Sequence, residues 1–213
     1  RMSGPNAQPV PETADTHHKL GVVHMRRGSL SAARSCLGTA LEAKKGIYKG
    51  STRTPELCES VAETYRALAS ACAQGKDFDG AEDQLEKALA VLEGCPSDDK
   101  EGLAPSTLSS VASVRTEMGD LAGARGDLSM AQEHYRDALE LRRELCSESA
   151  PPSPEFVEAL NKLGYAHALN GDNMEALELY EESLEAQRLI HGDKENEEMA
   201  GTMRTIEVLR ARC

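Results

Sequence analysis

The feature of the sequence that most limits its fold is a pattern of small and apolar residues that recurs four times. The clearest copy runs from Leu160 to Leu184 and has the sequence LNKLGYAHALNGDNMEALELYEESL. An alanine at the same place in each copy marks intervals of 48, 50 and 45 residues: Ala33, Ala81, Ala131 and Ala176. Self-similarity at a period of roughly 20 to 50 residues is typical of stacked repeats, in which one unit cannot bury its apolar face alone.

Within each copy, the small and apolar residues lie three and four positions apart, which places them on one face of an α-helix. A proline precedes the first helix of each copy, where its missing N–H is tolerated: Pro11, Pro55, Pro105 and Pro154. A small residue on each first helix is expected to let the paired backbones approach closely: Gly21, Ala69, Gly119 and Gly164. Each copy is therefore predicted to be a pair of packed helices.

The third copy contains two candidate turns, at Gly119–Asp120 and at Gly126–Asp127. We favour the later turn, because the first helix of this copy then has about the length of its counterpart in the second copy. The earlier turn would shorten that helix by seven residues.

The sequence thus predicts an all-α fold: an α-α superhelix (solenoid) of about four helix-turn-helix repeats plus a terminal helix, within one domain of residues 1–213. The expected repeats cover about residues 11–48, 55–94, 105–146 and 154–191, and the final helix covers 198–213. That final helix has no partner helix, so it either caps the stack or begins a repeat that the chain does not complete. Because the chain begins at Arg1, we expect that it could be a piece of a longer protein.

These residues resemble the tetratricopeptide repeat, whose pattern is W-x2-L-G-x2-Y followed by A-x3-F. In the clearest copy, Leu163–Gly164 match the first part, Ala176 and Tyr180 match the second, and His167 stands where tyrosine is usual. The repeat step is longer than the family's usual ~34 residues. Such steps, together with a Leu-Asn-x-Leu-Gly core, resemble the kinesin light chain branch of the family.

Composition argues against several kinds of partner. With 24 basic and 36 acidic residues, the formal net charge is -12, which is unsuited to neutralising the phosphates of a nucleic acid. No apolar run approaches the roughly 18 residues that span a bilayer, and the first residues lack the pattern of a signal peptide, so we expect no membrane partner. The six cysteines form no C-x-x-C pair, which is typical of free thiols in a reducing, cytoplasmic compartment.

Catalytic and metal-binding motifs are also missing from the sequence. His17 and His24 share a helical face, but no cysteine or carboxylate completes a ligand set at metal spacing. Neither a G-x-S-x-G motif, a phosphate-binding loop nor an H-E-x-x-H motif occurs. We therefore expect a protein that is not an enzyme and that needs no metal and no cofactor.

First helices line the concave wall of such stacks, so their residues that point away from the core are the candidates for contact with a partner. These are His18, Met25, Arg66, Ser70, Thr116, Asp120, Asn161, Tyr165 and Arg204. The resemblance to kinesin light chain repeats implies that Asn161 can bind the backbone amides of a peptide. The equivalent positions elsewhere hold other residues (His18, Arg66, Thr116 and Arg204), so a ladder of asparagines is absent.

The function predicted from these observations is that of a scaffold or adaptor, which binds a peptide or helix of a partner protein in its concave groove. A cargo or cytoskeletal subunit is among the candidate partners. Arg26, Arg66 and Arg204 near the groove suit a ligand that carries carboxylates, unless these side chains are simply solvated. The alternative function is an assembly module, which self-associates through its repeat ends or stacks within a larger complex.

Overall fold

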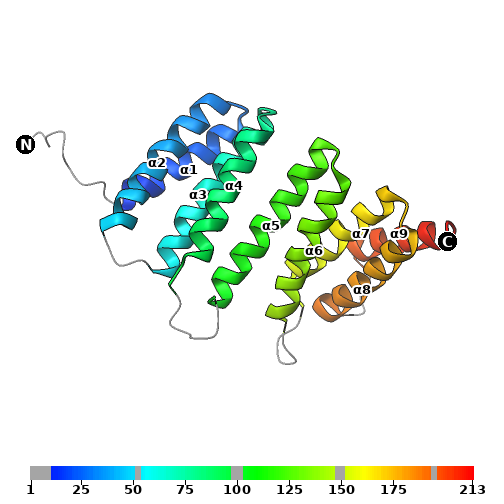
Figure 1. The fold of residues 1–213 in the computed structure, drawn as a ribbon. Coiled ribbons are helices and arrows are strands. Elements are labelled where there is room, and N and C mark those ends of the chain that lie inside the picture. Colours follow the sequence, from blue (N-terminus) through cyan, green and yellow to red (C-terminus); the bar gives the residue numbers. More distant parts are fainter. Residues whose placement is uncertain (1–10, 51–53, 97–102, 147–151, 193–195) are drawn as a thin grey trace, which may run out of the picture. The chain divides into compact units, whose positions relative to one another are not determined.

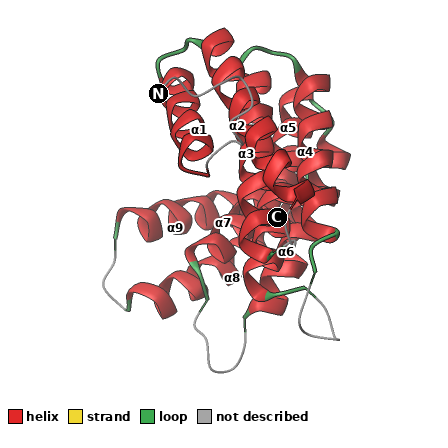
Figure 2. Ribbon diagram, turned by 90° about the vertical axis from the view of Figure 1, so that its left-hand side faces the viewer, coloured by secondary structure: helices red, strands yellow, loops and turns green. Residues whose placement is uncertain are grey.

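The computed structural model describes residues 11–50, 54–96, 103–146, 152–192 and 196–213 (Figure 1). These residues form nine helices and no strand, so the predicted all-α class is confirmed. Figure 2 colours the helices red. The helices are α1 (Pro11–Arg26), α2 (Leu30–Gly50), α3 (Pro55–Gln74), α4 (Phe78–Glu93), α5 (Pro105–Arg125), α6 (Leu128–Leu145), α7 (Pro154–Asn170), α8 (Asn173–His191) and α9 (Glu197–Arg210).

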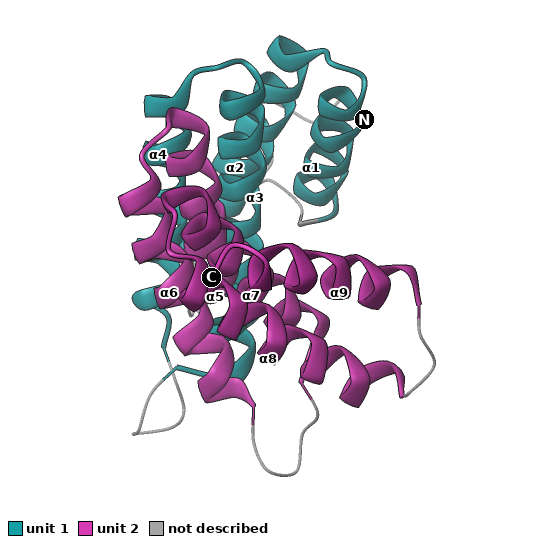
Figure 3. Cartoon of the chain, turned by 90° about the vertical axis from the view of Figure 1, so that its right-hand side faces the viewer, with its two compact units in different colours: residues 1–110 teal, residues 111–213 magenta. Residues whose placement is uncertain are grey.

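The chain divides into two compact units, which are coloured separately in Figure 3. Unit 1 comprises Arg1–Ser110 and unit 2 comprises Val111–Cys213, so the boundary lies within α5. The expected single groove along all the repeats stays a prediction.

In unit 1, α1 packs on α2, α3 packs on α4, and α2 contacts α3. The close approach of α1 and α2 depends on Gly21, where an added Cβ would lie 2.6 Å from Leu37 Cγ. Leu37 is fully buried, whereas Leu20, which the repeat pattern places in the core, is 43% exposed. Among the described helices, α1 packs mainly against α2, and the Leu20 side chain lies outside that contact.

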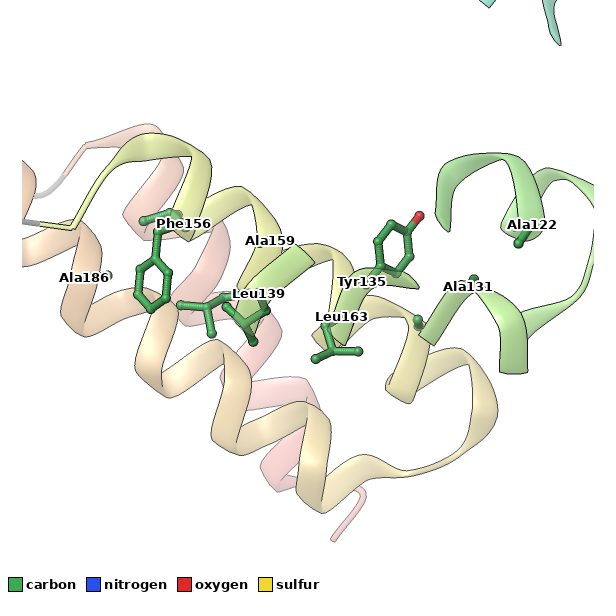
Figure 4. Close-up of a cluster of buried hydrophobic side chains, with 11 residues drawn as sticks. Ala122, Ala131, Tyr135, Leu139, Phe156, Ala159, Leu163 and Ala186 are labelled. Atoms are coloured by element: carbon green, nitrogen blue, oxygen red, sulfur yellow. The ribbon is translucent and has the colours of Figure 1, made fainter. Parts of the chain in front are cut away.

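In unit 2, α7 packs against both α6 and α8, and α8 packs against α9. A cluster of apolar side chains joins α6 to α7 and includes Leu139, Phe156, Leu160 and Leu163 (Figure 4). Burying each of these side chains contributes on the order of 1.5–3 kcal/mol. This cluster holds α7 with its apolar face inward, so the opposite face of α7 is available for other contacts.

The turn between α5 and α6 lies at Gly126–Asp127, the later of the two candidate turns. Gly126 has a φ of 86°, a left-handed conformation that favours glycine. Asp127 then caps α6, because its side chain accepts a hydrogen bond from the backbone N–H of Met130 at 3.0 Å. The other candidate, Gly119, lies inside α5, where an added Cβ would lie 2.5 Å from the Tyr135 ring.

Candidate functional site

A hollow of about 390 Å³ in unit 2, which we call the α7 hollow, is lined by side chains of α5, α6, α7 and α9. Its lining residues are Asp120, Tyr135, Pro154, Glu158, Asn161, Lys162, Tyr165 and Glu198. Five of these eight residues belong to α7, so this helix determines the position of most of the site.

The register of α7 explains why these residues gather there. Ser153 caps the helix by accepting a hydrogen bond from the N–H of Phe156 at 3.2 Å, and Pro154 occupies its start. Steps of three and four residues then align Glu158, Asn161 and Tyr165 on the side away from the buried leucines. Tyr165 is 60% exposed, although tyrosine is large enough to bury well in a protein core.

A charged network forms one wall of the α7 hollow. Lys162 Nζ donates to the Asp120 oxygens Oδ1 and Oδ2 at 2.6 and 2.5 Å, and it lies 3.4 Å from a carboxylate oxygen of Glu158. The Tyr135 hydroxyl donates to Asp120 Oδ1 at 2.7 Å, and Lys162 Nζ lies 5.9 Å from the centre of the Tyr135 ring. Burial, followed by the bond to Asp120, raises the pKa of Tyr135 well above its ordinary value, so this hydroxyl is a donor at physiological pH.

Two buried side chains of α8 form hydrogen bonds to residues that line the α7 hollow. The fully buried Ser183 donates its hydroxyl to Asn161 Oδ1 at 2.7 Å. One turn further along α8, the fully buried Gln187 donates from Nε2 to Glu198 Oε1 at 3.3 Å. With its oxygen engaged by Ser183, Asn161 has its amide nitrogen left to donate to a ligand.

A second hollow, of about 570 Å³, lies in unit 1. It is lined by Asp15, His18, Lys19, Val22, Val23, Arg26, Lys44, Ser60 and Glu63. The Lys44 side chain is only 4% exposed, and its Nζ donates to the Ser60 carbonyl at 3.1 Å and lies 3.3 Å from Asp15. Lys44 therefore ties α1, α2 and α3 together.

His18 belongs to the same bonded network. Its Nδ1 lies 3.1 Å from Thr64 Oγ1, and because that hydroxyl donates to the Ser60 carbonyl, the histidine is the donor in this pair. Its Nε2 lies 3.7 Å from Glu63. Burial, followed by the charge of Lys44, lowers the pKa of His18 below the ordinary value of 6.5, which favours the neutral ring.

A third hollow, of about 360 Å³, also lies in unit 1 and is lined mostly by residues of α3, so we call it the α3 hollow. Its lining residues are Glu56, Glu59, Ser60, Ala62, Glu63, Arg66 and Ser110. Glu59 accepts a hydrogen bond from Thr107 Oγ1 at 3.4 Å. The lining of this hollow contains three carboxylates and one arginine.

The nine residues predicted to contact a partner are distributed unevenly among these hollows. Asp120, Asn161 and Tyr165 come together in the α7 hollow, while His18 and Arg66 line the two separate hollows of unit 1. The remaining four line none of the three: Met25, Ser70, Thr116 and Arg204.

Two of these four donate a hydrogen bond to the backbone of their own helix. Thr116 Oγ1 donates to the Ala112 carbonyl at 3.0 Å, and Arg204 Nε donates to the Ala200 carbonyl at 3.1 Å. Among the described residues, Ser70 is exposed and accepts from Gln74 at 3.4 Å. No described contact relates these side chains to the α7 hollow, and their role in binding stays a prediction.

Sequence reasoning missed Tyr135, Lys162, Glu158 and Glu198 as residues of the site. The repeat pattern does place Tyr135 correctly in the core, where its ring is buried, but gives no sign that its hydroxyl reaches Asp120. A signal for Glu158 and Lys162 was available, since these two residues lie four positions apart on α7.

Within the described ranges, no group of three or more His, Cys, Asp or Glu side chains could hold a metal ion. A search of the same ranges finds no helix with the length and apolarity needed to cross a membrane.

Comparison with known proteins places these helix pairs in a family. The sequence model of the tetratricopeptide repeat matches residues 18–99 and 116–188, which together make up more than half of the chain. The chain belongs to the tetratricopeptide repeat family. No curated protein sequence matches it closely enough to indicate a relative.

Several solved structures have the same fold. BtubC (BKLC) from P. vanneervenii has a TM-score of 0.74 at 18% sequence identity, covering 95% of this chain and 73% of that one. A putative kinesin light chain from Podospora anserina, with nearly identical repeats, has a TM-score of 0.68 at 17% identity, covering 95% and 88%. The apo form of RapI has a TM-score of 0.68 at 14% identity, covering 94% of this chain and 52% of that one. At identities this low, the likeness shows a shared fold alone.

Proposed function

We propose that this chain is a scaffold or adaptor that binds a segment of a partner protein on the first-helix faces of its repeats, with the α7 hollow as the main contact site. The observation that carries the proposal is Tyr165, an aromatic side chain that is 60% exposed at a hollow where Asp120 and Asn161 converge. Exposed tyrosines that can enter a partner's surface are typical of the residues that dominate binding energies at interfaces.

The family supports the same conclusion, because tetratricopeptide repeat proteins are generally scaffolds that bind proteins or peptides and are not catalysts. In the proposed complex, Asn161 Nδ2 donates to a carbonyl of the bound segment while Ser183 keeps the amide in that orientation. The likeness to a putative kinesin light chain makes a cytoplasmic cargo or cytoskeletal subunit the first class of partner to look for.

Affinity capture from the source cells, followed by mass spectrometry, tests this proposal. The immobilised chain is compared with the variant Tyr165→Ala and with the matched control Leu189→Ala, whose side chain is 65% exposed on α8. We expect the wild type and the control to retain the same partner and Tyr165→Ala to lose most of it. Retention of the same proteins by all three chains would contradict the role of the α7 hollow.

The alternative of self-association is separated by light scattering at several concentrations. Val208 on α9 is 50% exposed, and α9 is the last described helix, so an end-to-end contact would bury this residue. A mass that rises with concentration, and that Val208→Asp returns to that of a monomer, would favour the assembly module. We expect a monomer at all concentrations.

A further inference from the structure

We infer that the α7 hollow binds an arginine side chain of the partner segment. The inference rests on the proposed function, because it names the chemistry of the ligand at the same site. It differs from what the sequence suggested, since isolated arginines near the expected groove pointed to a ligand that carries carboxylates.

The α7 hollow carries more negative than positive charge. Three carboxylates line it, from Asp120, Glu158 and Glu198, against the single cation of Lys162. Lys162 is bonded to both oxygens of Asp120, and the Tyr135 hydroxyl also donates a hydrogen bond to Asp120. The positive charge is thus already used within the protein, and the lining keeps a formal charge of about two negative units.

Two carboxylates of the α7 hollow have unused hydrogen-bond acceptors. A carboxylate can accept about four hydrogen bonds. Among the described residues, Glu158 has one cationic neighbour, at 3.4 Å, and its side chain is 58% exposed. Glu198 accepts one bond, from the neutral amide of Gln187 at 3.3 Å. Both carboxylates therefore have room for donors that a ligand brings.

An independent observation comes from the interior, behind Glu198. Gln187 is fully buried, its amide group is directed at Glu198 by the bond from Nε2, and its Oε1 has no hydrogen-bond partner in the part of the chain that the structure describes. The bond from Gln187 holds the Glu198 carboxylate in the lining and uses one of its acceptor positions, so the others stay open to a ligand.

The aromatic lining favours arginine over lysine. The guanidinium group is planar, carries five N–H donors and stacks on aromatic rings, whereas the ammonium group of lysine is a compact and strongly hydrated charge. Tyr165 is exposed to such stacking. A volume of about 390 Å³ accommodates one long side chain with part of its backbone.

The α3 hollow of unit 1 has a charge of the same sign. Glu56, Glu59 and Glu63 face Arg66 there, so the arginine expected to attract a carboxylate is outnumbered by carboxylates of the chain itself. Arg204, a second of the three arginines in that expectation, donates to the backbone of its own helix. These surroundings favour a basic segment over an acidic one.

The test uses the whole chain and three fluorescein-labelled peptides of identical length, in which Ser-Gly-Xaa is repeated three times with arginine, lysine or glutamate at Xaa. Fluorescence anisotropy is measured at about 0.15 M salt, where screening weakens long-range attraction between exposed charges. We expect the arginine peptide to bind, the lysine peptide to bind at least about threefold more weakly and the glutamate peptide not to bind.

A pair of double variants locates the binding. Glu158→Gln with Glu198→Gln removes two charges from the hollow and is expected to weaken the arginine peptide about tenfold or more. The matched control, Glu140→Gln with Glu144→Gln, removes two charges from exposed positions of α6 and is expected to change the affinity less than about twofold. Circular dichroism confirms that all the variants remain folded.

Three results would overturn the inference: equal weakening by both double variants, preference for the glutamate peptide, or no binding of the arginine peptide. None of these results would by itself contradict the proposed function. That function is tested separately, by whether Tyr165→Ala loses the partner in affinity capture. Conversely, if Tyr165→Ala captures the same proteins as the wild type, the proposed function fails whatever the peptides do.

Discussion

His18 in unit 1 and Asn161 in unit 2 occupy the same position of the repeat, but their surroundings differ. In unit 1, His18 on α1 is only 9% exposed and donates to Thr64, within a network that ends at the buried Lys44. In unit 2, Asn161 on α7 is half-buried, and the neighbouring Tyr165 is 60% exposed. The place of a residue in the repeat therefore does not decide whether a partner can reach it; the side chains that pack around it do.

The two lysines of these regions illustrate the cause. Lys44 comes from a second helix, α2, and extends its chain inward until only 4% of the side chain is exposed, where it reaches both Ser60 and Asp15. Lys162 comes from a first helix, α7, and is bonded to Asp120 with 25% of its side chain exposed. The network of unit 1 thus stabilises the packing, whereas that of unit 2 shapes an open surface.

Replacing Lys44 is expected to change the stability of the chain most. Lys44→Ala removes a buried chain and the donor to the Ser60 carbonyl, and we expect it to lower the free energy of unfolding by about 2 to 4 kcal/mol. Lys162→Ala, which breaks a partly exposed pair, is expected to lower it by about 1 kcal/mol or less. Urea unfolding followed by circular dichroism measures both. Equal effects would remove the distinction between the two networks.

A second prediction concerns the backbone approach that fixes the Tyr135 ring. Gly119→Ala places a Cβ 2.5 Å from this ring and is expected to destabilise the chain by about 1 to 3 kcal/mol. Gly123→Ala, in the same helix with nothing within 4 Å of its Cβ, should instead stabilise it by about 0.5 to 1 kcal/mol. Thermal unfolding compares the two variants. A gain in stability for Gly119→Ala would show that α5 and α6 are not packed as described.

The hydrogen bond from the Tyr135 hydroxyl should contribute about 1.5 kcal/mol to the free energy of unfolding, because its acceptor is the charged Asp120. We expect Tyr135→Phe to lower the unfolding free energy by that amount. The matched variant Tyr180→Phe, in which the ring is equally buried against a helix glycine, is expected to have a smaller effect. Urea unfolding at neutral pH distinguishes them, and identical values would argue against the bond to Asp120.

The smallest expected effect is the pH dependence caused by His18. Its pKa is lowered in the folded chain, so its contribution to stability is present above the ordinary value of 6.5 and is lost as the pH falls through the folded pKa. We expect the wild type to lose more stability than His18→Gln between about pH 7 and pH 5, a range above most carboxylate pKa values. Parallel pH profiles of the two chains would show that His18 is not buried beside Lys44.

Much of the fold could be predicted because the repeat leaves local marks. The turn at Gly126 follows from the left-handed glycine and the capping Asp127, and the close contacts of Gly21 and Gly119 follow from small residues at one repeat position. The exposure of Leu20 could not be predicted from the pattern, since the pattern does not show that α1 packs mainly against α2 among the described helices.

The candidate site could be predicted only in part, for a similar reason. Asp120, Asn161 and Tyr165 lie on first helices at the expected register, and the structure brings them to one hollow. The lining also depends on contacts between residues far apart in the sequence, such as Lys162 with Asp120, which are 42 residues apart. No periodic pattern in a single sequence shows such pairs, so the charge of the hollow emerges only from the folded chain.

The central claim is that a partner protein contacts the first-helix face of unit 2 and not its second helices. Photocrosslinking tests it most directly, with benzoylphenylalanine introduced either in place of Tyr165 on α7 or in place of Leu189 on α8, two side chains of similar exposure. After capture of the partner from the source cells and irradiation, we expect a crosslinked product from position 165 and none from position 189. A product from position 189 alone, or equal products from both, would contradict the account.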